Sequence, residues 1–213
     1  MLSKANNDLL TQTGPGTPGG RLLRSYWQPI ATSEELPPDG APLPLRVMSE
    51  DLVLFRDDND RLGLIGQFCP HRGTDLSYGR VENGGLRCLY HGWLFDIHGQ
   101  CIEQPAEPKG KTFCHKVRHT AYPVQEKGGV IWAYMGQGEP PLIPNFQFLT
   151  APEANRIAFR TIGRFYCYSE DLWVWPTVNI TRADCHRCCI VAVIPQCYKG
   201  GWLLAIRSRN EAE

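Results

Sequence analysis

Short apolar runs, separated by turn-forming residues at close and fairly regular spacing, dominate the middle of the chain. In residues 43–47, for example, Leu and Val alternate with Pro and Arg. The other runs are residues 52–55, 62–68, 76–78, 86–88, 93–97, 100–103, 122–125 and 130–135. Several are joined by segments rich in Asp, Asn and Gly, which are typical of hairpin turns. The pattern predicts a mainly β domain of short antiparallel strands.

The N-terminal residues follow a different pattern. Residues 1–16 are polar and glycine-rich and are expected to form a surface loop. Thr17 and Pro18 suit the N-cap and first position of a short helix, which we expect to pack on the body. Its packing residues would be Leu22, Leu23, Tyr26 and Trp27. Gly14–Gly19 matches G-x-G-x-x-G by letter, but no strand precedes it and two prolines remove amide donors, so we interpret it as a chance match.

Composition excludes several classes of protein. The 22 basic residues balance the 22 acidic ones, which argues against nucleic acid or an anionic membrane as the main partner. No apolar run approaches the roughly 18 residues of a membrane span, and the N-terminus does not resemble a signal sequence. Nine cysteines, an odd number, argue against a secreted disulfide framework. We therefore expect a cytoplasmic protein.

Two short motifs each pair one cysteine with one histidine. The first holds Cys69 and His71, the second Cys88 and His91, and 16 residues separate His71 from Cys88. Structural zinc sites usually group Cys with Cys and His with His. Mixed arms suit a [2Fe–2S] cluster in which one iron takes both thiolates and the other both imidazoles. The spacing favours this cluster over zinc, which remains the alternative.

Other polar residues carry weaker signals. Cys114, His115 and His119 could be imagined as a second metal site, but their spacing would suit one only on a helix. Arg72 lies in the first motif and Arg80 follows it along the chain. They could form a basic rim for a reductase, or they could make salt bridges within the cluster loops.

The motifs Cys-Pro-His-Arg-Gly at 69–73 and Cys-Leu-Tyr-His-Gly-Trp at 88–93 resemble the Rieske iron–sulfur motif of aromatic-ring oxygenases. Respiratory Rieske proteins carry an extra cysteine in each arm, and these two form a disulfide. Thr74 and Leu89 stand near those places here. Respiratory proteins also have a serine after the second His-Gly, where this chain has Trp93. The resemblance therefore implies the oxygenase branch, with its lower reduction potential.

The resemblance extends over about residues 1–165. The opening Gly-Pro-Gly-Thr-Pro and the segment at 125–136, Gln-Glu-Lys-Gly-Gly-Val-Ile-Trp-Ala-Tyr-Met-Gly, are similar to oxygenase components of the phthalate-dioxygenase type. This implies an N-terminal extension over residues 1–40 and a Rieske [2Fe–2S] domain over 41–145. Residues 146–213 would be a truncated or divergent start of an α+β catalytic domain.

In that family the catalytic domain holds a mononuclear Fe(II) on two histidines and one carboxylate. After residue 150 this sequence has one histidine, His186, with Asp171 and Asp184 as candidate carboxylates. We therefore expect the chain to accept electrons but to oxidise no substrate alone. The tail also carries Cys185, Cys188, Cys189 and Cys197, which suggest either a zinc knuckle or a divergent segment; we favour the latter.

The resemblance implies an electron relay. A NADH-dependent reductase containing flavin and an iron–sulfur centre would supply electrons, and a mononuclear iron, in a neighbouring subunit of a homotrimer, would receive them. A standalone Rieske electron carrier is the main alternative function, and a structural zinc protein is the lesser one.

Overall fold

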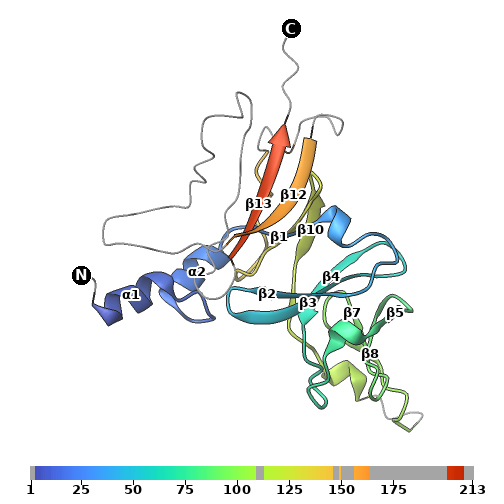
Figure 1. The fold of residues 1–213 in the computed structure, drawn as a ribbon. Helices are drawn as coiled ribbons and strands as arrows, with labels where there is room; N and C mark the ends of the chain where they lie inside the picture. Colours follow the sequence, from blue (N-terminus) through green and yellow to red (C-terminus); the bar gives the residue numbers. More distant parts are fainter. Residues whose placement is uncertain (1–2, 109–112, 146–148, 150–155, 164–200, 209–213) are drawn as a thin grey trace.

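The structure, a computed structural model, describes residues 3–108, 113–145, 149, 156–163 and 201–208. They form small antiparallel sheets with few helices, which confirms the predicted mainly β class (Figure 1). The strands are β1 (Gln28–Thr32), β2 (Leu43–Val47), β3 (Glu50–Arg56), β4 (Leu62–Gly66), β5 (Arg80–Glu82), β6 (Gly85–Arg87), β7 (Leu94–Asp96), β8 (Cys101–Glu103), β9 (Ala121–Tyr122), β10 (Val124–Lys127), β11 (Val130–Ala133), β12 (Arg156–Gly163) and β13 (Gly201–Ser208). The helices are α1 (Lys4–Thr11) and α2 (Pro18–Arg24), with single 3-10 turns η1 (Ser33–Glu35), η2 (Leu76–Tyr78) and η3 (Cys114–Lys116).

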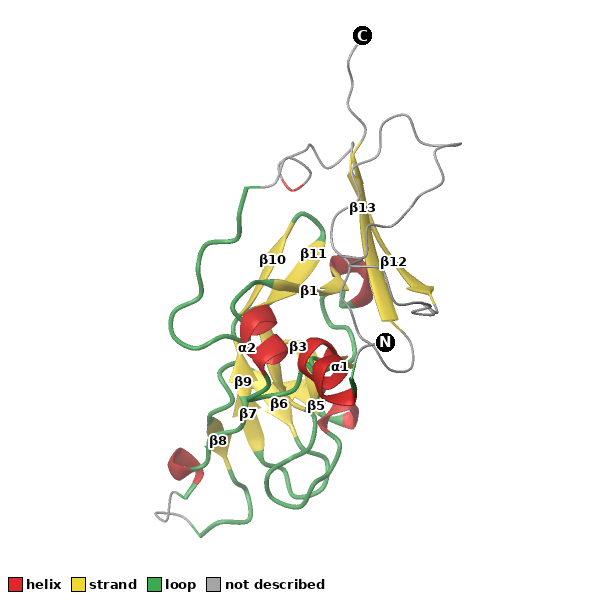
Figure 2. Ribbon diagram, turned by 90° about the vertical axis from the view of Figure 1, so that its left-hand side faces the viewer, coloured by secondary structure: helices red, strands yellow, loops and turns green. Residues whose placement is uncertain are grey.

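Three sheets make up the body, in the orders β2-β3-β4-β9, β1-β11-β10 and β5-β6-β7-β8. Strands β12 and β13 pair with each other in register from Arg156–Ser208 to Gly163–Gly201. Figure 2 shows this pair at the opposite end of the molecule from the β5–β8 sheet. Among the described residues, no helix is long and apolar enough to cross a membrane.

The central strands β3 and β4 of the β2-β3-β4-β9 sheet are buried on both faces. Side chains alternate across a strand, so neighbouring residues of β3 and β4 enter different cores. Leu52, Leu54 and Leu64 pack into one core together with residues of β1 and β11. Val53, Phe55 and Ile65 pack into the other, together with residues of the β5–β8 sheet. The sheet therefore separates the two cores. The chain leaves this sheet at the end of β4 and continues to Cys69.

The N-terminus differs from the prediction. Residues 4–11 form helix α1, so the expectation of a loop over residues 1–16 is wrong. The side chain of Ser3 caps this helix by accepting a hydrogen bond from the amide of Asn6 at 3.2 Å. A cap of this kind satisfies one of the free amides of the first turn. The sequence did not predict the helix because the helical period of its apolar residues is too weak.

Helix α2 begins as predicted, because Thr17 accepts a hydrogen bond from the Gly20 amide at 3.0 Å and Pro18 occupies the first turn. Of the four predicted packing residues, two pack as expected and two do not. Leu22 and Tyr26 are 60% and 61% exposed, whereas Arg24 is buried. The short helix therefore docks through a cation, with Leu23 and Trp27 as its apolar contacts.

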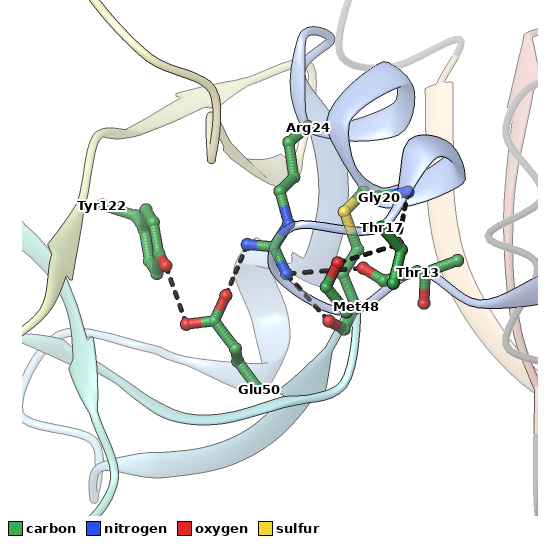
Figure 3. Close-up of polar contacts among 8 residues, drawn as sticks. Thr13, Thr17, Gly20, Arg24, Met48, Glu50 and Tyr122 are labelled. Carbon is green, nitrogen blue, oxygen red and sulfur yellow. Dashed lines mark hydrogen bonds and ion pairs between the residues drawn. The ribbon is translucent and has the colours of Figure 1, made fainter.

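Arg24 is buried because it has specific partners (Figure 3). It forms an ion pair with Glu50 and donates a hydrogen bond to the Met48 carbonyl at 2.9 Å. Tyr122 donates its hydroxyl to the other oxygen of Glu50 at 2.7 Å. The network joins α2 to β3 and β9, and thereby fastens the N-terminal segment to the central sheet.

Most predicted strands are present within one to three residues of their expected bounds, with two exceptions. Residues 122–125 are divided between β9 and β10, which belong to different sheets. Residues 76–78 form the turn η2 and not a strand, because the Asp75 carboxylate caps the turn by accepting from the Ser77 amide at 2.8 Å. The domain boundaries stay a prediction, although β1 from the predicted extension pairs with β11. The tail residues Asp171, Asp184, Cys185, His186, Cys188, Cys189 and Cys197 lie outside the described residues.

His119 provides a pH-dependent contribution to stability. Its Nε2 lies 2.8 Å from the Gly66 carbonyl, to which a neutral ring donates, and burial lowers the pKa of the ring below its ordinary value. The unfolded chain therefore binds a proton more readily than the folded one. We expect stability to be complete above about pH 6.5 and to fall as the pH drops below that value.

Urea unfolding between pH 5 and 8 checks this expectation. His119→Gln keeps an amide donor for the Gly66 carbonyl but cannot be protonated, so its unfolding free energy should fall less at acid pH than that of the wild type. His98, exposed in the β7–β8 turn, is the matched control, and His98→Gln should keep the wild-type slope. Equal slopes for wild type and His119→Gln would contradict the assignment.

Candidate metal centre

The first cysteine–histidine motif forms a closed loop at the end of β4. The Cys69 amide donates to the Thr74 carbonyl at 2.8 Å, and the Gly73 amide donates back to the Cys69 carbonyl at 2.8 Å. Gly73 has φ +70°, a left-handed conformation that glycine adopts without strain. Gln67 and Asp75 are joined by a 2.8 Å hydrogen bond at the base of the loop. We call residues 69–74 the first loop.

The second motif repeats this backbone pattern between β6 and β7. The Cys88 amide donates to the Trp93 carbonyl at 2.8 Å, and the Gly92 amide donates to the Cys88 carbonyl at 3.1 Å. Gly92 has φ +75°, and a Cβ there would lie 3.0 Å from Cγ of Pro105. Residues 88–93 are the second loop. The two loops thus close in the same way, although the histidine stands two residues after the cysteine in the first and three in the second.

Arg87 supports the second loop from beneath. It is buried, it pairs with the carboxylates of Glu82 and Glu103, and it donates a hydrogen bond to the Gly92 carbonyl at 2.6 Å. Burial opposes a charged guanidinium, but the hydrogen bonds with both carboxylates raise its pKa above the ordinary value. Arg87 therefore stays charged and ties the loop to strands β5 and β8.

The structure brings all four predicted site residues to the adjoining loops. The side chains of Cys69 and Cys88 are buried at their base, each 3% exposed. The rings of His71 and His91 lie nearer the surface, with centroids 4.5 Å apart. The arrangement separates a buried pair of thiols from a partly exposed pair of imidazoles.

The electrostatics of each pair follow from this placement. Burial raises the pKa of the Cys69 thiol to about 11; the neighbouring Cys88 adds to the shift, and the backbone amides of His71 and Arg72 oppose it. Partial desolvation, together with the nearby His71 and Arg72, lowers the pKa of His91. The Cys69 thiol is therefore protonated at neutral pH without a metal, so metal binding there releases a proton.

The donor set fits a [2Fe–2S] cluster with two thiolates and two imidazoles. Within the described part of the chain, no three Cys, His, Asp or Glu side chains converge as a single metal ion would need. In a Rieske cluster each iron takes only two protein ligands, so two pairs of side chains are enough.

The other candidate metal residues do not assemble. Cys114 is buried in the same core as Cys101, while His115 is exposed and His119 contacts the Gly66 carbonyl. The basic rim is also only partly present. Arg72 is exposed, and Arg80 lies 3.8 Å from Glu82, at the limit of an ion pair.

Residues around the loops were not singled out from the sequence as part of the site. Arg87 stands in strand β6, where no spacing signals it. Trp93 was noted only for its lack of a hydroxyl, yet its ring stacks on His71. The loop surface also exposes Phe68, Tyr78, Leu89 and Tyr90.

Residues 26–128 match the Rieske [2Fe–2S] domain family, and this range includes both loops and all of the strands that position them. Curated proteins that are similar to the chain include oxygenase subunits. Residues 26–128 of the chain belong to the Rieske [2Fe–2S] domain family. This confirms the resemblance found in the two motifs.

Two curated Rieske relatives are informative. The chain is 50% identical over 151 residues to the 5,5'-dehydrodivanillate O-demethylase oxygenase subunit of a Sphingobium species, covering 69% of this chain and 35% of that one. It is 46% identical over 147 residues to the phthalate 4,5-dioxygenase oxygenase subunit of Pseudomonas putida, covering 68% and 33%. The chain therefore spans about a third of the length of these relatives.

Solved structures show the same Rieske relationship. Apo dicamba monooxygenase aligns with a TM-score of 0.57 at 30% identity, over 65% of this chain and 43% of that one. The oxygenase of carbazole 1,9a-dioxygenase, solved in complex with ferredoxin, aligns with a TM-score of 0.55 at 27% identity, over 65% and 36%.

Proposed function

We propose that this Rieske domain binds a [2Fe–2S] cluster through Cys69, Cys88, His71 and His91 and relays electrons within an oxygenase component. The observation that carries the proposal is the pairing of two buried thiols with two partly exposed imidazoles on loops of matching backbone structure. When bound, such a cluster takes up and releases one electron at a time. The cysteines would hold the inner iron and the histidines the outer one.

The protein's own residues would prepare the site in three ways. The cysteines lie in an apolar core with Leu76, Leu86 and Phe95, which excludes water from their sulfur atoms. Gly73 and Gly92 close the loops, so that the backbone can approach a bound group without a side chain in the way. The Arg87 guanidinium fixes the Gly92 carbonyl beside the second histidine. Binding and orientation are thus provided by the loops and their supports.

We propose an electron-transfer protein as the partner. The exposed side chains of Phe68, Leu89 and Tyr90, together with Arg72, offer an apolar surface with positive charge beside the histidines. Protein interfaces are commonly enriched in aromatic residues and arginine. The relationship to a carbazole dioxygenase oxygenase solved with ferredoxin supports a partner of this class. The specific donor would be a NADH-dependent reductase with flavin and an iron–sulfur centre.

The acceptor would be a mononuclear Fe(II), with substrate oxidation as the activity of the whole oxygenase. The names of the relatives, a phthalate 4,5-dioxygenase and a 5,5'-dehydrodivanillate O-demethylase among them, support aromatic compounds as the substrate class. The described residues contain no site for that iron. A homotrimer and a cytoplasmic location complete the proposal.

The reduction potential tests this assignment. Two imidazole ligands place a Rieske centre between about −150 and +300 mV. Trp93 follows Gly92 and carries no hydroxyl to donate toward the cluster, so we expect a midpoint near the lower end of that range. Redox titration followed by electron paramagnetic resonance measures it. A midpoint well above about +100 mV would contradict the placement in the oxygenase branch.

A reduction assay tests the relay itself. NADH with a flavin- and iron–sulfur-containing reductase of the phthalate type should bleach the oxidised visible spectrum, and omission of the reductase is the control. Arg72→Glu should slow this reduction at low salt, because it reverses a charge at the loop surface. The midpoint of the same variant is measured beside the rate, so that a change in driving force is separated from a change in docking. A protein that dithionite reduces but no such reductase does would argue against this donor class.

A further inference from the structure

The two loops are held together by an aromatic contact that crosses from one to the other. The indole of Trp93, in the second loop, stacks face to face on the imidazole of His71, in the first. The ring centroids are 4.5 Å apart and the planes differ by 3°. His71 also meets His91 edge to face at 4.5 Å. His71 is therefore bounded on two sides by rings that the second loop supplies.

Trp93 is itself firmly placed. Its carbonyl closes the second loop by accepting from the Cys88 amide at 2.8 Å. Its ring packs against the core that contains both cysteines, and it contacts the fully buried Phe95 with centroids 6.4 Å apart. The neighbouring Tyr90 behaves differently, because it is 61% exposed and lies over His91 of its own loop. Trp93 is thus anchored at its base and bridges the loops, whereas Tyr90 covers one histidine from outside.

No covalent link takes this role, because Cys69, Cys88, Cys101 and Cys114, the cysteines that the structure describes, are all free. An imidazole turns easily about its terminal torsion, which is broad and roughly two-fold. A parallel indole face restricts that rotation, and offset or stacked aromatic pairs are favourable beyond the area they bury. Trp93 therefore limits the directions in which the His71 nitrogens can point.

We propose that Trp93 is a positioning residue that clasps the first loop to the second by fixing the ring of His71. This inference rests on the proposed function, since it assigns Trp93 a role toward the same cluster. It predicts that the histidines are unequal, with His71 held by a partly buried stack and His91 covered by an exposed ring. Loss of the stack should loosen one imidazole ligand and leave the other as it was.

The test compares three variants of the purified, cluster-containing protein. Trp93→Leu removes the stack, Trp93→Phe retains an aromatic face, and Tyr90→Leu removes a ring from the same loop that contacts His91 alone. Release of iron to an excess of ferrous chelator should be about tenfold faster in Trp93→Leu than in wild type. We expect Trp93→Phe and Tyr90→Leu to stay within about threefold of the wild-type rate.

A second readout separates positioning from general packing. Pulsed electron paramagnetic resonance of the reduced protein resolves the couplings of the two ligand nitrogens. In Trp93→Leu one coupling should shift or broaden and the other should stay, whereas a loss of core packing alone would change unfolding without selecting one nitrogen. Trp93→Phe keeps the proposal testable if Trp93→Leu fails to fold. In Trp93→Phe the coupling of the same single nitrogen should shift in the same direction, by a smaller amount.

The outcomes are distinguishable. Unchanged couplings in both Trp93 variants, or iron release as fast in Tyr90→Leu as in Trp93→Leu, would overturn the proposal. A wild-type protein that binds no iron and sulfide would instead overturn the proposed function, before any variant is compared.

Discussion

Replacing Cys88 with alanine is expected to abolish cluster binding. Wild-type protein should contain about two irons and two acid-labile sulfides per chain, because the two loops offer one complete set of ligands. Removal of one buried thiol leaves the inner iron with a single protein sulfur. We expect Cys88→Ala to retain less than about a tenth of the iron and sulfide, as measured by colorimetric assay of both.

Cys101 is the matched control for this experiment. It is fully buried in the same core as Cys88, so Cys101→Ala makes a comparable cavity without removing a predicted ligand. The control variant should keep its red-brown colour and its iron, even if it is somewhat less stable. One zinc per chain without labile sulfide, or equal losses in both variants, would refute the ligand assignment.

Replacement of Arg24 with methionine is expected to lower the free energy of unfolding by about 3 kcal/mol, because it leaves a largely buried carboxylate without its cation. Glu50 keeps only the hydroxyl of Tyr122, and the Met48 carbonyl loses its donor (Figure 3). Urea unfolding at neutral pH gives the value. The large effect reflects the cost of the uncompensated charge more than the strength of the pair itself.

Two further variants test that reasoning. Arg46–Asp51 is an exposed pair at 3.2 Å on the adjacent hairpin, and Arg46→Met should cost less than about 1 kcal/mol. Adding Glu50→Gln to Arg24→Met should recover part of the loss, because it removes the unpaired charge. If Arg24→Met were as mild as Arg46→Met, the network would not fasten the N-terminal segment as described.

The strands could be predicted from the sequence because their apolar runs and turn residues agree. The turn between β3 and β4 is an example, because Asp57 holds it by accepting hydrogen bonds from Arg61 and the Asn59 amide. These hydrogen bonds lower the pKa of Asp57, although burial opposes its ionisation, so the carboxylate remains an acceptor. The four Cys and His residues were found for a related reason. Their identities and spacing carry the chemistry, whatever the exact path of the loop.

The remaining features depend on contacts between distant segments, which no local pattern encodes. Arg24 looks like the exposed residue of a short helix, until Glu50 and the Met48 carbonyl are brought to it. Residues 76–78 have strand-like composition, but the Asp75 cap bends them into a turn. The stack between Trp93 and His71 likewise needs both loops in place.

The two loops close through the same backbone hydrogen bonds, although their histidines stand at different positions. One backbone frame, closed by cysteine amides and a left-handed glycine four residues later, accepts the histidine at either of two intermediate positions. The backbone structure of the loop and the position of its histidine can therefore vary independently. A protein engineer could move the histidine by one place within an intact frame and so re-aim a ligand, without rebuilding the strands that carry it.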